Sequence, residues 1–151
     1  MARIRTGIEI RGLKDLTRAL KDIDAQLPKE LADLNQQVGE SVISGARGRA
    51  STPLEHRAAR TLKAARQQRV VLIRLGGGRY PEALGAEFGA GQGTLRNTTR
   101  GVMEGWNQFR PWRGSGGDAG YFLFPTIRED TPQIIDRHYD LIYEFVQRHF
   151  T

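Results

Sequence analysis

The chain has 151 residues, of which 38% are hydrophobic, 18 are glycine and none is cysteine, and its formal net charge is +6. Disulfides and thiolate metal sites are therefore excluded, and no apolar run approaches the roughly 20 residues that a membrane span requires. The N-terminus lacks the continuous apolar core of a signal peptide. We therefore expect a soluble protein without an export signal, and the length favours a single domain over residues 1–151.

The first part of the chain predicts one strand and two helices. Apolar and charged residues alternate over Ile4–Ile10, which is typical of a short strand. Leucines spaced by three and four positions over Leu13–Ile23 predict an amphipathic helix. Pro28 suits the first turn of a second helix, whose apolar stripe covers Leu31–Val42. Gly39 within that stripe favours a closely packed neighbour.

The middle of the chain is less regular. Leu54–Arg66 is rich in alanine and arginine, which predicts a helix or an ordered arm that depends on a partner. Val70–Leu75 is apolar and largely β-branched and ends at three glycines, which predicts a strand followed by a turn. Tyr80–Gly89 is compatible with either a short helical turn or an irregular strand.

The last third begins with a long glycine-rich segment. Gly91–Gly117 is predicted to be an extended loop or a contact arm, because long loops in compact proteins are usually functional. The aromatic–aliphatic run Tyr121–Phe124 stops at Pro125 and predicts a buried strand. About Thr131–His149 is then predicted to be the final helix, with one broad apolar face.

These elements predict an α+β fold. A small mixed or antiparallel sheet, built from Ile4–Ile10, Val70–Leu75 and Tyr121–Phe124, would pack against the N-terminal helices and the long C-terminal helix.

Positive charge is concentrated between Ser41 and Leu75, a segment that contains eight arginine and lysine residues but only one acidic residue, Glu55. Such a segment is either a solvated helix face or a surface that meets nucleic acid or an acidic partner. The candidate basic surface consists of Arg47, Arg49, Arg57, Arg60, Lys63 and Arg66.

Residues that carry chemistry do not form a recognisable constellation. The three histidines are far apart in sequence, and the glycine-rich stretch at residues 89–93 lacks the Lys-Ser/Thr of a P-loop. We therefore expect no catalytic, metal-binding or cofactor-binding residues and no enzyme activity. A small hydrolase is the third choice of function, behind a structural protein and a nucleic-acid-binding protein.

Three large aromatic residues within the glycine-rich segment are costly to leave in water. They could anchor contact with another subunit, or they could fold back on their own domain as a satellite cluster. The candidate interface consists of Trp106, Phe109, Trp112, Phe88, Arg110 and Arg113.

Four stretches in order resemble the tail-component proteins of long-tailed bacteriophages, also described as neck or tail-completion proteins. Ile8–Ile23 resembles the opening strand and leucine-patterned helix of that family. Ala46–Pro53, followed by Arg60–Lys63, is similar to its long helix with a basic end and the segment that follows. Tyr80–Gly89 is similar to the element that ends in Glu-Phe-Gly, and Phe122–Ile127 is similar to the closing Pro-Phe-Leu-x-Pro-Ala motif.

The resemblance implies a structural virion protein without catalytic activity. Such a protein is a ring subunit, most simply of a hexamer, that joins or completes the head–tail connection. The implied partners are further copies of the chain, adjacent neck or connector proteins, and tail-terminator or tail-tube proteins, with non-specific contact to DNA in the channel and no membrane. The implied location is the virion, and the host cytoplasm during assembly. The alternative is a basic nucleic-acid-binding regulatory protein.

Overall fold

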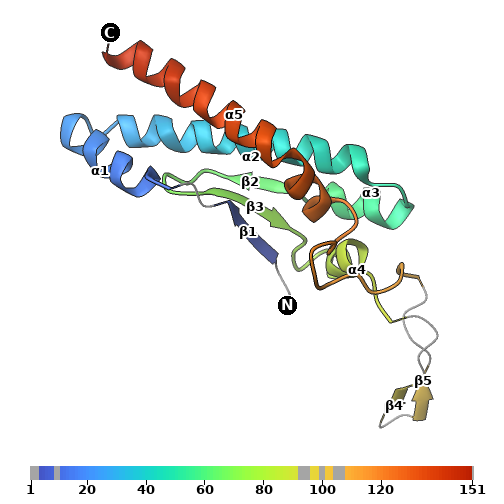
Figure 1. The fold of residues 1–151 in the computed structure, drawn as a ribbon. Helices are drawn as coiled ribbons and strands as arrows, with labels where there is room; N and C mark the ends of the chain where they lie inside the picture. Colours follow the sequence, from blue (N-terminus) through green and yellow to red (C-terminus); the bar gives the residue numbers. More distant parts are fainter. Residues whose placement is uncertain (1–3, 9–10, 92–95, 99–100, 104–107, 151) are drawn as a thin grey trace.

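The computed structural model describes residues 4–8, 11–91, 96–98, 101–103 and 108–150. The fold is α+β, as the sequence predicts, with helices packed on an antiparallel sheet and a long C-terminal helix (Figure 1). The elements in chain order are β1 (Ile4–Ile8), α1 (Leu13–Ile23), α2 (Leu27–Arg49), α3 (Pro53–Ala59), β2 (Lys63–Ala65), β3 (Val71–Leu75), α4 (Ala83–Phe88), β4 (Arg96–Thr98), β5 (Gly101–Met103) and α5 (Leu123–Phe150).

The main sheet has three antiparallel strands in the order β1-β3-β2. β3 alternates between buried residues, which face the helices, and half-buried residues such as Arg74 on the other face. Lys63 of β2 lies directly opposite Arg74. β4 and β5 form a separate hairpin inside the segment predicted to be a loop, and in Figure 1 this hairpin lies away from the helices.

α2 is the central layer of the fold, between the sheet on one side and α5 on the other (Figure 1). Val38 and Ile43 are almost fully buried, and the burial extends around most of the helix. The predicted close neighbour of Gly39 is the sheet: a Cβ at this position would lie 2.8 Å from Cβ of Ala64. Only glycine therefore lets α2 approach β2 this closely.

The predicted helix over Leu54–Arg66 is only partly correct. α3 has the capping box expected of a stable start, since the Thr52 hydroxyl accepts from the Glu55 N–H while the Glu55 carboxylate accepts from the Thr52 N–H. The helix ends at Ala59, and Lys63–Ala65 becomes strand β2. Pairing with the apolar strand β3 outweighs the helix propensity of this alanine- and arginine-rich segment.

The predicted strand Tyr121–Phe124 is wrong, because α5 begins at Leu123 and continues through the helix predicted over Thr131–His149. A short apolar run does not by itself distinguish a buried strand from a buried helix start. Pro125 fits the first turn of α5 because no N–H is needed there for intrahelical bonding.

The start of α5 is held by the carboxylate of Glu87, which is fully buried. Its two oxygens accept from the backbone N–H groups of Phe122, Leu123 and Phe124 at 3.3, 3.0 and 2.9 Å. Gly120 completes the arrangement: its φ is 84°, and a Cβ there would lie 2.2 Å from Oε1 of Glu87. Burial raises the pKa of Glu87, while the hydrogen bonds from the backbone lower it and offset part of that effect.

A second buried polar group connects α2 to α5. Nε2 of His138 lies 3.0 Å from Oδ1 of Asn35, and the Asn35 amide nitrogen donates to the carbonyls of Gln67 and Gln68. Because the amide nitrogen is already a donor, Oδ1 is the acceptor and Nε2 of His138 carries the proton. Burial lowers the pKa of His138 below its ordinary value of 6.5.

We predict that Glu87→Ala destabilises the protein by about 3 kcal/mol, because two buried N–H groups and one partly buried N–H group lose their acceptor at about 1 kcal/mol or more each. Glu82→Ala is the matched control, since Glu82 is exposed and makes no side-chain cap to α4. Urea unfolding of both variants measures the difference. Equal stability of the two variants would show that the buried carboxylate does not support α5.

We also predict that His138 makes stability fall in acid. Because its folded pKa is lowered, the unfolded chain binds the proton first as the pH falls below 6.5, and stability decreases towards the folded pKa; above 6.5 this contribution is constant. His138→Gln should reduce this loss between about pH 7 and pH 5. Unfolding curves at several pH values test this, and an unchanged slope in His138→Gln contradicts it.

Candidate interaction surface

The most prominent exposed feature is an apolar stripe on α5. Its members recur at spacings of four, four, three and four positions, so at 100° per residue they fall within about 80° of the helix circumference. Their exposed fractions range from 36% to 69%, with the two tyrosines the most exposed. We call this set the outer stripe; it consists of Ile135, Tyr139, Tyr143, Val146 and Phe150.

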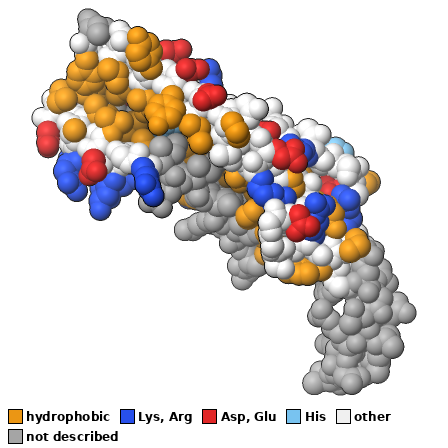
Figure 2. Space-filling model, in the orientation of Figure 1, with side chains coloured by type: hydrophobic (Ala, Val, Ile, Leu, Met, Phe, Trp, Pro, Cys, Tyr) orange, Lys and Arg blue, Asp and Glu red, His pale blue; other side chains and the backbone are white. Residues whose placement is uncertain are grey.

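The inner face of α5 is a different set of residues. It packs on α2 and consists of Ile134, His138, Leu141 and Phe145. Its centre lies about 130° around the helix from the centre of the outer stripe. The broad apolar face predicted for this helix is present but only partly covered: α2 packs on its inner part, half-buried Ile142 lies between, and the outer stripe is exposed. Figure 2 shows hydrophobic side chains gathered over the upper left of the molecule, where α1 and the C-terminal half of α5 lie in Figure 1.

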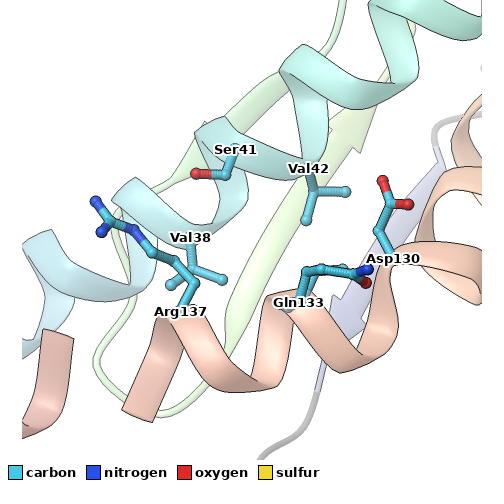
Figure 3. Close-up of a pocket in the computed structure, with 7 residues that line it drawn as sticks. Val38, Ser41, Val42, Asp130, Gln133 and Arg137 are labelled. Carbon is cyan, nitrogen blue, oxygen red and sulfur yellow. The ribbon is translucent and has the colours of Figure 1, made fainter. Parts of the chain in front are cut away.

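A hollow of about 360 Å³ lies between α2 and α5 (Figure 3). Val38 and Val42 come from α2, while Asp130, Gln133 and Arg137 come from α5. Its one hydroxyl, on Ser41, donates to the carbonyl of Gln37 in the preceding turn, and no histidine lines the hollow. The hollow therefore lacks the serine–histidine pair of a histidine-activated nucleophile.

Three described members of the candidate interface, Phe109, Arg110 and Arg113, are engaged by their own chain. Phe109 is 8% exposed and packs on α4 beside Gly85. Arg110 pairs with the buried Glu55 carboxylate at 3.2 Å. The guanidinium groups of Arg110 and Arg113 lie 4.0 and 5.1 Å from the centre of the Tyr121 ring. For these residues the structure favours the alternative in which they fold back on their own domain.

Two aromatic residues of this set are placed differently. Trp112 is 62% exposed, and its ring lies 6.4 Å from that of Phe88. Phe88 is half-buried and also contacts Phe124, at 5.2 Å between ring centres. Trp106 lies outside the described residues. Among the described aromatic members of the candidate interface, Trp112 is the one whose ring is mostly exposed.

The residues of the candidate basic surface do not act together, because three of them bind other parts of their own chain. Arg47 donates to the carbonyls of Ala59 and Leu62, and so ties α2 to the end of α3. Arg49 pairs with Glu129 of α5 at 2.6 Å. Arg66 pairs with Asp33, which lowers the pKa of that carboxyl.

The other three members of that candidate surface, Arg57, Arg60 and Lys63, are exposed. Arg60 and Lys63 lie together with Arg74 and Arg79 around the turn after β3. Arg79 lies beyond Leu75, where the basic segment of the sequence ends, and only the return of the chain after Gly76–Gly78 brings it beside the other three.

Several kinds of site are not found in the described part of the chain. No three His, Cys, Asp or Glu side chains among the described residues are close enough to hold a metal ion. None of the helices described has both the length and the apolar character needed to cross a membrane. Comparison with known proteins finds no matching family, no matching curated protein and no matching solved structure.

We predict that two aromatic truncations change the free energy of unfolding by very different amounts. Phe109→Ala should cost about 3 kcal/mol, because it removes a buried ring. Trp112→Ala should change stability by about 0.5 kcal/mol or less, because most of the ring is already exposed. Thermal unfolding of the two variants provides the measurement. A large loss with Trp112→Ala would mean that its ring belongs to the core of its own subunit.

Proposed function

We propose that this protein is a structural subunit of the neck or tail of a long-tailed bacteriophage, where copies of the chain form a ring that joins or completes the head–tail connection. The observation that carries the proposal is the outer stripe of α5. A stripe of large apolar side chains on an otherwise folded domain is characteristic of an interaction surface. The resemblance of four ordered motifs to the tail-component family supports the same function.

A second copy of the chain is the occupant that we propose for the outer stripe. A ring needs two different surfaces that meet head to tail on each subunit. The outer stripe is one, and the exposed Trp112 beside Phe88 is a distinct aromatic surface. In Figure 1 the C-terminal end of α5 and the chain that leads directly into the start of α5 lie at opposite sides of the molecule. That separation suits a head-to-tail contact, and six copies would match the symmetry of the tail.

No enzymatic step is part of this proposal. Buried carboxylates Glu55 and Glu87 are both used in structural roles, since each accepts backbone hydrogen bonds at a helix start. His138 is likewise bonded to Asn35. The proposed partners beyond the chain itself are the rings above and below it, and the proposed locations are the virion and, during assembly, the host cytoplasm.

We predict that Tyr139→Ser/Tyr143→Ser prevents self-association, because it removes the two most exposed rings of the outer stripe. The matched control is Asp140→Ser/Glu144→Ser, which changes two exposed residues at the same spacing on another side of α5. Sedimentation velocity measures the mass relative to the 16.9 kDa chain. The wild type and the control should form a ring of several copies, whereas the tyrosine variant should sediment as a folded monomer.

The functional test is assembly of particles in the phage that encodes the chain. Loss of the protein, or the tyrosine variant alone, should leave filled heads and unjoined or unfinished tails, whereas the control variant should give infectious particles. The protein should also co-purify with complete particles. Normal particle assembly in its absence would overturn the proposed function, and a tyrosine variant that assembles normally would overturn the role of the outer stripe.

A further inference from the structure

A second hollow, of about 460 Å³, lies beside β2 and β3 at the turn that follows β3. Four cationic side chains line it together with Thr61, Tyr80 and the turn glycines, and no carboxylate does. We call it the basic hollow; its cations are Arg60, Lys63, Arg74 and Arg79.

The cations of the basic hollow lack acidic partners among the described residues. Arg49, Arg66 and Arg110 each pair with a carboxylate, but none of the four cations here forms an ion pair with a described residue. Arg47, which also lacks a carboxylate, instead donates to two carbonyls. Arg47, Arg49 and Arg66 of the basic segment are thus engaged by the protein itself, whereas the basic hollow gathers four cations that have no counter-charge among the described residues.

Two details indicate that an anion belongs there. Nε of Arg74 is buried and has no hydrogen-bond acceptor among the described residues, and because buried polar atoms normally have a partner, this exception calls for an explanation such as a bound water or ion. Lys63 lies directly opposite Arg74 on the neighbouring strand, and like charges in that position destabilise a sheet. An anion between the two side chains would remove the repulsion.

We propose that the basic hollow binds phosphate groups of a nucleic-acid backbone. Guanidinium groups match phosphate oxygens through paired N–H donors, and lysine adds a further charge. Gly76, Gly77 and Gly78 put no side chain over the site, so a phosphodiester can approach the backbone closely. This inference does not depend on the proposed ring function.

The chemistry of the lining favours phosphate over the other anions of a cell. One arginine satisfies one carboxylate, whereas four cations in one hollow match a ligand that carries several closely spaced charges. Gly78 and Arg79 are exposed, so the hollow opens to solvent and suits an extended polyanion. No asparagine or glutamine lines it to read base edges, and the Tyr80 hydroxyl is bonded to the carbonyl of Leu54. Because the proposed contacts are made to phosphates, which carry no sequence information, binding should be independent of sequence.

The experiment compares two variants of the full chain that lose the same charge. Lys63→Gln/Arg79→Gln removes two cations from the basic hollow, and Lys14→Gln/Lys21→Gln removes two exposed lysines from α1. Fluorescence anisotropy with a labelled DNA duplex of arbitrary sequence gives the affinity as a function of salt. The site variant should bind roughly tenfold more weakly at low salt and lose about 2 from the slope of log affinity against log salt, at about 1 per contact. The α1 variant should stay close to the wild type.

A stability measurement separates the site from general damage to the fold. Lys63→Gln should raise the melting temperature of the unliganded protein, because it removes the like charge opposite Arg74. The same substitution should weaken DNA binding. A variant that is more stable and binds less cannot have lost binding through unfolding. A lower melting temperature for Lys63→Gln would contradict the repulsion on which the inference rests.

Other outcomes would overturn the proposal. Equal weakening by the two charge-matched variants would mean that only net charge matters. No binding of duplex DNA at low salt, together with thermal stabilisation by tripolyphosphate that the site variant lacks, would identify a site for small free polyphosphates in place of nucleic acid. Displacement of DNA by polyglutamate as readily as by tripolyphosphate of equal total charge would identify a site for an acidic protein.

Discussion

The buried carboxylate of Glu87 is the interaction on which the arrangement of the C-terminal half depends. It belongs to the short helix α4, but its hydrogen-bond donors are the first N–H groups of α5. Helix starts leave these N–H groups without partners, and an anionic acceptor there also interacts favourably with the helix dipole. One side chain therefore sets where α5 begins and holds α4 against it. That connection also places Phe88 beside Phe124 and, through them, the exposed Trp112.

The position of α5 explains why the molecule has a second apolar face to offer. α2 lies between the sheet and α5, so its burial is divided between two layers. Asn35 and His138 hold α5 in one rotational position, since their hydrogen bond is buried and forms only when both side chains point into the α2–α5 contact. With the inner face of α5 occupied in this way, the outer stripe has no described element to cover it. Self-association would bury it without any change in the fold.

The positive charge of the chain is divided between structural and available groups. Arg47 and Arg49 connect helices, and Arg66 ties the segment after β2 to α2. Arginine suits these roles because its planar group donates several hydrogen bonds at once. The cations of the basic hollow form no ion pair with a described residue. Two of them, Lys63 and Arg74, lie opposite each other on neighbouring strands. A group that costs stability and is nevertheless present is best explained by a ligand, which is why this hollow and not the total charge supports phosphate binding.

The sequence by itself determined the α+β class, the strands at β1 and β3, and helices α1 and α2. Each of these elements has regularly spaced apolar residues and is bounded by glycine or proline. It did not determine the start of α5, since the run Tyr121–Phe124 is apolar in a way that fits either a strand or a buried helix turn. Only the distant Glu87 carboxylate resolves that choice. Nor could the sequence divide the apolar residues of α5 into an inner face and an outer stripe, or separate the paired arginines from the free ones. Those distinctions depend on which residues from distant parts of the sequence contact each side chain, and local periodicity carries no information about such contacts.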